Sequence, residues 1–159
     1  MLAQILQAFT LLNSAGAEQS YVARGAKMKC TMGTSPGILN LPLDHGVYAH
    51  STEKPLLNIT DAKCGPDANI SDAAAFGVCI ITGGVCKPII SPDAKWSNGK
   101  DNVLIDGQPA LLDNATLSCA CQAPTTVERT YHAYGPVSTE IVHPGASGGI
   151  ISITTNGID

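Results

Sequence analysis

Charged and aromatic side chains are scarce in this 159-residue chain: Asp, Glu, Lys and Arg make up 14% of it, and Phe, Trp and Tyr 4%. Only 9 residues are Lys or Arg, against 13 Asp or Glu, so the formal net charge is −4. Because phosphate binding needs clustered basic side chains, this balance argues against a nucleic-acid partner. No apolar run in the sequence is long enough to cross a bilayer as a helix.

Motifs of common enzymes are also missing. Catalysis needs a nucleophile with a base, or paired carboxylates in a cleft, and the sequence has no hydrolase, phosphate-binding or dinucleotide-binding motif. Asp44 and His45 are the most suggestive pair, but adjacent residues point to opposite faces of a strand. We therefore expect no enzymatic activity.

Glycine and proline, in contrast, are abundant, with 16 and 10 residues. Both interrupt helices, which favours many short strands and turns, and the length suits one domain with a buried core. The clearest hairpin signal is Asp106-Gly107 between the apolar runs 103–105 and 110–112, because glycine adopts the positive φ of a tight turn. The sequence therefore predicts an all-β fold over residues 21–159.

The amino-terminal segment has a different pattern. Its apolar residues between Leu2 and Leu12 fall mostly on one helical face, and residues 13–16 provide a stop. It lacks a basic start, and Gln4 and Gln7 interrupt the apolar stretch, which is not typical of a secretory signal. We expect a short helix within an arm, residues 1–20, outside the β domain.

Six cysteines carry the most informative chemistry: Cys30, Cys64, Cys79, Cys86, Cys119 and Cys121. Their even number allows three disulfides, whereas the lack of an export signal favours reduced thiols that bind a metal. Neither the pair Cys79 and Cys86 nor the pair Cys119 and Cys121 has the tight spacing of a zinc knuckle. The four histidines are alternative ligands: His45, His50, His132 and His143.

Three nine-residue segments each end in a cysteine: VARGAKMKC at 22–30, LLNITDAKC at 56–64 and LLDNATLSC at 111–119. Their shared shape suggests a strand-turn unit repeated three times, which would bring Cys30, Cys64 and Cys119 to one end. Chance similarity among short polar strands is the alternative.

Several motifs occur in the order that they have in PAAR-like proteins: VARGAKMKCTMG (22–33), LNLPLDHGVY (39–48), FGVC (76–79), CKP (86–88), VLIDGQPALLDNATLSC (103–119) and GGIISI (148–153). The chain resembles this family over residues 21–121 and 148–153. The family contains relatives of the PAAR spike-tip proteins of type VI secretion and of extracellular contractile injection systems.

The resemblance implies a small all-β cone, sharpened by a bound metal near its apex, that caps a trimeric spike protein and pierces the target membrane. Four cysteines fall on cysteine-bearing motifs of the family: Cys30, Cys79, Cys86 and Cys119. PAAR proteins proper bind zinc mainly through histidines, so a site of these four cysteines, holding zinc or iron, is an extrapolation. Such a protein would assemble in the cytoplasm and then form part of a secreted or extracellular particle.

The chain departs from the family pattern in two places. Residues 80–85, between FGVC and CKP, form a shorter stretch than usual, and residues 122–147 are inserted before GGIISI. Alternation in residues 126–130 predicts a strand, so we expect the insertion to form a hairpin on the flank of the cone. The repeated segments favour Cys64 as a ligand and the resemblance favours Cys86; we follow the resemblance.

Two further expectations concern partners. A tip would dock on its spike through a broad base, with GGIISI as a basal strand and apolar contacts from Val103, Ile105, Ile150 and Ile153. The alternative function is a secreted binding module stapled by disulfides, which would suit the glycosylation motifs at Asn58, Asn69 and Asn114.

Overall fold

The structure is a computed structural model that describes residues 19–49, 53–123, 125–131, 133, 135, 137–143, 145 and 147–158. All regular elements in this part of the chain are β-strands, which confirms the all-β prediction. The helix expected near the amino terminus lies outside the described residues. Within the described ranges, no helix is long and apolar enough to cross a membrane.

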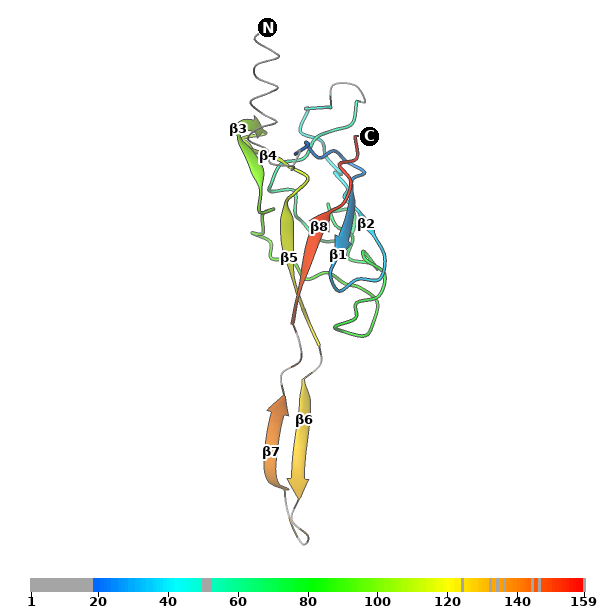
Figure 1. The fold of residues 1–159 in the computed structure, drawn as a ribbon, viewed down its shortest axis with the longest axis vertical. Helices are drawn as coiled ribbons and strands as arrows, with labels where there is room; N and C mark the ends of the chain where they lie inside the picture. The colour runs from blue at the N-terminus through cyan, green and yellow to red at the C-terminus, as the bar shows by residue number, and fades with distance from the viewer. Residues whose placement is uncertain are drawn as a thin grey trace.

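A four-stranded antiparallel sheet forms the centre of the body (Figure 1). Its spatial order is β2 (Gly37–Ile38), β1 (Lys27–Cys30), β8 (Ser147–Ile153) and β5 (Thr116–Gln122). β8 pairs with β1 on one side and with β5 on the other. The GGIISI run is therefore a central strand with both edges paired, and the expectation that it forms a basal docking strand is wrong.

The hairpin signalled by Asp106-Gly107 is present as β3 (Gly99–Ile105) and β4 (Gln108–Leu111). Both turn residues have positive φ, 53° at Asp106 and 81° at Gly107, as a type I′ turn requires. Figure 1 shows the hairpin at one end of the body, the end that the chain reaches after β8.

The inserted residues form a second hairpin from β6 (Thr126–Tyr131) and β7 (Val137–His143). Figure 1 shows it extending away from the body, beyond the ends of β5 and β8, and not lying along the flank. Among the described strands, β6 and β7 contact only each other. Gln122 and Ser147 pair where β5 and β8 lead into the hairpin, so a short turn at that point would also connect the two strands.

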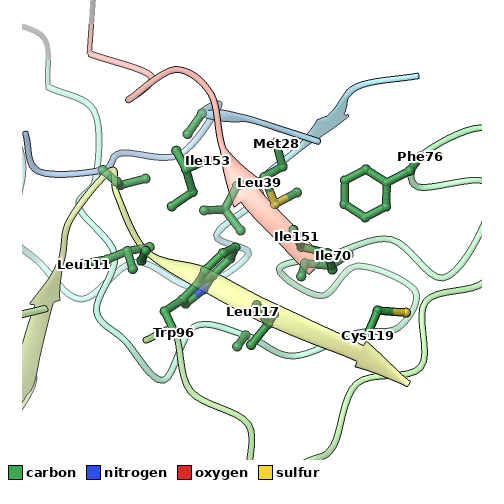
Figure 2. Packing of buried hydrophobic residues seen from close by; sticks show 14 of the residues in the cluster. Met28, Leu39, Ile70, Phe76, Trp96, Leu111, Leu117, Cys119, Ile151 and Ile153 are labelled. Carbon is green, nitrogen blue, oxygen red and sulfur yellow. The ribbon is translucent and has the colours of Figure 1, made fainter. Parts of the chain in front are cut away.

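The core lies between the central sheet and the long loops that cover it (Figure 2). Leu117 and Ile151 project from β5 and β8, and fully buried loop residues such as Ile70 pack against them. Trp96 is buried in the same cluster, and its indole N–H donates to the Asp61 carbonyl oxygen at 2.9 Å, so its polar atom is satisfied. Segments outside the strands thus supply most of this core cluster.

Two residues expected to contact a spike belong to this interior. Ile105 is 1% exposed and Ile153 is 9% exposed, so their side chains are not available to a partner. Successive side chains along a strand point to opposite faces, and this alternation determines which residues are buried. Along β8, for example, Ile153 points into the core and Ile150 lies on the opposite, exposed face.

The three cysteine-ended segments are equivalent only in part. The first ends in β1 and the third in β5, and both strands pair with β8. Cys64, which ends the second segment, makes only an isolated bridge to Ile70. Near their first residues the three segments nevertheless bond to one another in a ring: the Leu57 amide donates to the Val22 carbonyl, the Leu111 amide to the Leu57 carbonyl, and the Val22 amide to the Leu111 carbonyl. The predicted threefold arrangement is therefore present where the segments begin and is lost towards their cysteines, because only two of the segments pair with β8.

Candidate functional site

Five of the six cysteines line one pocket of about 220 Å³. They are the four predicted ligands and one more: Cys30, Cys79, Cys86, Cys119 and Cys121. Apolar side chains, including Met32 and Phe76, complete the wall. All six cysteines of the chain are free thiols, and not the three disulfides that their even number allowed.

The central sheet brings three of these thiols together. Leu117, Cys119 and Cys121 alternate with exposed residues along β5, so all three side chains point inward. Cys30 is the last residue of β1, on the other side of β8. Gly149 of β8 lies between them: a Cβ added there would be 3.1 Å from Cys30 Sγ and 3.6 Å from Cys121 Sγ. The missing side chain at Gly149 is what leaves room for thiols from β1 and β5 to approach each other.

The other two thiols come from the loop over residues 78–89. The Cys79 amide donates to the Gly84 carbonyl at 2.9 Å, and the Gly83 amide donates back to the Cys79 carbonyl at 2.8 Å. Gly83 has a φ of 75°, which glycine tolerates without strain. Buried and exposed residues alternate on both sides of this turn, and this alternation points Cys79 and Cys86 into the pocket.

Backbone N–H groups donate hydrogen bonds to the sulfurs of all four predicted ligands. The partners are Met32 and Gly33 for Cys30, Ile81 and Thr82 for Cys79, Phe76 for Cys86, and Ile89 for Cys119, where the N–H to Sγ distance is 3.3 Å between heavy atoms. Such donors favour the thiolate, which is the form of cysteine that binds a metal. These donors act against burial, which nevertheless raises the pKa of both Cys30 and Cys86.

The pKa values of two thiols show the balance between burial and these donors. Burial raises the pKa of Cys30, and the amides of Met32 and Gly33 offset only part of that effect. Burial also acts to raise the pKa of Cys79, but the amides of Ile81 and Thr82 and the Thr82 hydroxyl outweigh it, so the pKa of Cys79 is lowered.

Cys121 and Cys64 lie in settings that favour the protonated thiol. Burial, together with the neighbouring Cys119 and Cys79, raises the pKa of Cys121 to about 12. The Cys64 sulfur lies 3.5 Å from the Pro88 carbonyl oxygen, which can only accept a hydrogen bond. Cys64 is also not among the residues that line the pocket, in contrast to the prediction from the repeated segments.

The donor set suits a metal, although its geometry is incomplete. Zinc and iron bind cysteine sulfur in four-coordinate sites, and thiolates in a partly buried pocket are their usual ligands. Among the residues that the structure describes, no three Cys, His, Asp or Glu side chains are grouped closely enough to hold an ion. The structure thus brings the predicted ligands to one pocket, and the sulfurs would have to close on an ion to bind it.

A family profile described as "Domain of unknown function (DUF4280)" matches residues 22–130. The chain belongs to the DUF4280 family. No curated protein matches the chain, and no solved structure matches it. The DUF4280 match contains all six cysteines and stops within β6, so Gly149 and the rest of β8 lie beyond the matched residues although they complete the pocket.

The histidines of this DUF4280 chain do not join the pocket where the structure describes them. His143 lies on β7, where its Nε2 is 3.1 Å from the Glu128 carboxylate. His45 lies near the β3–β4 turn, away from the cysteines. His50 and His132 lie outside the described residues.

His45 of the DUF4280 chain instead bridges two carboxylates. Its Nε2 is 2.8 Å from Asp61 and its Nδ1 is 3.1 Å from Asp106, an arrangement that suits an imidazolium donating from both nitrogens. Burial alone would lower the pKa of His45, but the hydrogen bonds and charges of Asp61 and Asp106 outweigh burial and raise it. We call these three residues the His45 clamp; it ties residues 43–48 to the β3–β4 turn.

Two residues of the pocket escaped the sequence reasoning. Cys121 follows Cys119 at a spacing of two, which on a strand places both side chains on one face, but the spacing was judged only against zinc knuckles. Gly149 was expected only as part of the GGIISI strand, because nothing in the sequence shows that cysteines from β1 and β5 meet across it.

Proposed function

We propose that this chain is a structural tip protein, without enzymatic activity, that caps and sharpens the trimeric spike of a contractile injection system for piercing a target membrane. The observation that carries the proposal is that five thiols line one pocket near the end of β5, where β5 and β8 lead into the β6–β7 hairpin. A metal bound to these thiols would link β1, β5 and the loop over residues 78–89, and would add its binding energy to the packing of the core there.

The proposed ligands of that metal are the four thiols that receive backbone hydrogen bonds: Cys30, Cys79, Cys86 and Cys119. Zinc or iron in such a closed site has a structural role. The unfolded chain has no preformed site, so binding stabilises the fold, by roughly 10–16 kcal/mol in zinc-finger peptides at neutral pH. Cys121 would remain a protonated neighbour of the site.

The opposite end of the body suits docking on a spike. The His45 clamp holds residues 43–48 against the β3–β4 turn, and apolar side chains are exposed there: Leu43, Val47, Tyr48 and Leu104. Exposed apolar side chains grouped at one site are typical of protein interfaces. One chain would then cap three spike subunits, assemble with them in the cytoplasm and leave with the secreted or extracellular particle.

Elemental analysis of the purified protein tests the metal site. We expect one zinc or iron per chain in the wild type and in Cys64→Ser, whose thiol lies outside the pocket, but no stoichiometric metal in Cys79→Ser. A metal-free wild type would refute the site. Thiol titration of the denatured protein tests the alternative: three disulfides would favour the secreted module.

Co-expression with a trimeric spike protein, followed by native mass spectrometry, tests the cap. We expect one chain per spike trimer, and loss of the complex in Leu104→Asp. The matched control is Ile38→Asp on β2, because Ile38 and Leu104 are 64% and 59% exposed. Three copies per trimer, no complex, or equal loss in the control would contradict this docking mode.

A further inference from the structure

The alternation that points two cysteines into the pocket leaves an apolar surface on the same loop, beside the pocket, and three of its residues also line the pocket: Val85, Lys87 and Ile89. Residues 78–80 and 85–89 alternate between exposed and buried, with Cys79, Cys86 and Pro88 buried. The exposed partners form what we call the outer face of the loop: Val78, Ile80, Val85, Lys87 and Ile89. Its four aliphatic side chains are 45%, 64%, 59% and 55% exposed.

The backbone of the loop holds these side chains outward. Val78 and Val85 are paired by an antiparallel bridge, so they lie side by side on the same face. The Ile80 amide donates to the Met32 carbonyl at 2.8 Å, and the Val78 amide donates to the Thr34 hydroxyl at 2.9 Å. These hydrogen bonds fix the backbone of the loop, so the loop cannot turn over to bury these side chains against the body.

The charge of this region differs from that of the rest of the chain. Between Asp72 and Asp93 the only charged residue is Lys87, although the chain has 13 acidic residues and a net charge of −4. An anionic lipid surface repels acidic protein surfaces and attracts lysine. The outer face thus comes from a stretch of sequence without acidic residues, and it presents aliphatic side chains with a lysine among them.

We infer that the outer face of the loop is a membrane-contact surface that inserts its aliphatic side chains at the headgroup boundary of an anionic phospholipid bilayer. Interfacial binding of this kind scales with the apolar area buried and with attraction to anionic lipids. A protein partner fits the face less well, because protein interfaces are enriched in Tyr, Trp and Arg, and the face has none of them. The face borders the pocket, at the end opposite the surface proposed to dock on a spike, so it would stay free in the assembled particle.

Flotation of the purified chain with phosphatidylcholine vesicles, with and without phosphatidylglycerol, tests the surface. We expect binding that increases with phosphatidylglycerol and a partition coefficient that falls at least about tenfold in the double variant Ile80→Ser/Val85→Ser. The matched control is Ile38→Ser/Val142→Ser, since these side chains are 64% and 56% exposed, close to the 64% and 59% of Ile80 and Val85. All four side chains are exposed, so both double variants should unfold at nearly the wild-type temperature.

The lysine has its own test. Lys87→Gln should weaken binding to phosphatidylglycerol vesicles by about fivefold, whereas Lys100→Gln, a substitution of an exposed lysine on β3, should not. Absence of vesicle binding by the wild type, or equal loss in the matched controls, would overturn the assignment. No spike protein is present, so failure here leaves the spike-capping proposal standing, and vesicle binding without spike binding would refute that proposal alone.

Discussion

Replacing His45 with alanine tests how the loop that carries Leu43 and Tyr48 is held against the β3–β4 turn. The Asp61 carboxylate is mostly buried, with its side chain 11% exposed, and it would keep only the Asn58 amide, at 2.8 Å, from its described partners. A hydrogen bond to a charged group contributes about 1.5–3 kcal/mol to stability. The second carboxylate, Asp106, is 71% exposed, so screening limits its contribution to at most about 1 kcal/mol.

The loss of stability caused by His45→Ala should be larger at low pH than at high pH. The pKa of His45 is raised in the fold above its ordinary value of 6.5. The ionic contribution is therefore fully present below pH 6.5 and is lost as the pH rises through the folded-state pKa. Neutral His45 still donates one hydrogen bond, so we expect His45→Ala to cost about 2–3 kcal/mol at pH 5.5 and about 1 kcal/mol at pH 9.

Thermal unfolding followed by circular dichroism at both pH values measures this. One kcal/mol shifts the Tm of a chain of this size by about 2–4 °C. His143→Ala is the matched control, because His143 and its partner Glu128 are 54% and 67% exposed and their pair should contribute little. A His45→Ala penalty that grows with pH, or one equal to that of His143→Ala, would refute the clamp.

Three further predictions follow from the fold. Gly149→Ala should lower the metal content and the Tm, because its Cβ would lie 3.1 Å from Cys30 Sγ, whereas Gly84→Ala, with open space around the added Cβ, should change neither. Ile151→Ala should lower the free energy of unfolding by about 2–5 kcal/mol in urea titration, because Ile151 is fully buried. Ile150→Ala, at an exposed position of the same strand, should lower it by less than about 0.5 kcal/mol. Equal losses would contradict the strand register. Replacing residues 123–146 by Asn-Gly should leave the Tm within a few degrees of wild type, and collapse of the fold would show that the β6–β7 hairpin belongs to the core.

Local signals were sufficient for some elements. Asp106-Gly107 predicted a hairpin that the structure contains, because a two-residue turn with positive φ is encoded by the turn residues themselves. The alternation in residues 126–130 predicted the strand that became β6, because the period of two in a strand is also a local property of the sequence. The direction of the β6–β7 hairpin was not predictable, because it depends on where β5 and β8 lead away from the body.

Non-local pairing produced the errors. GGIISI has the composition of a strand, and it is one, but its position between β1 and β5 depends in part on β1, whose paired residues lie more than a hundred positions earlier in the sequence. The three cysteine-ended segments look alike in sequence, yet only two of them pair with β8, and nothing local to Cys64 indicates that it would be left out.

The sequence by itself determined the strand-rich character, the tight β3–β4 turn and the set of thiols available for a site, since composition and turn chemistry act over a few residues. Only the tertiary structure decided which thiols meet. Cys30, Cys119 and Cys121 approach because β8 lies between β1 and β5 and carries glycine at position 149, and Cys79 and Cys86 join them because the loop over residues 78–89 alternates inward and outward. Contacts between segments distant in the chain are set by the packing of the whole core, which no short stretch of sequence contains.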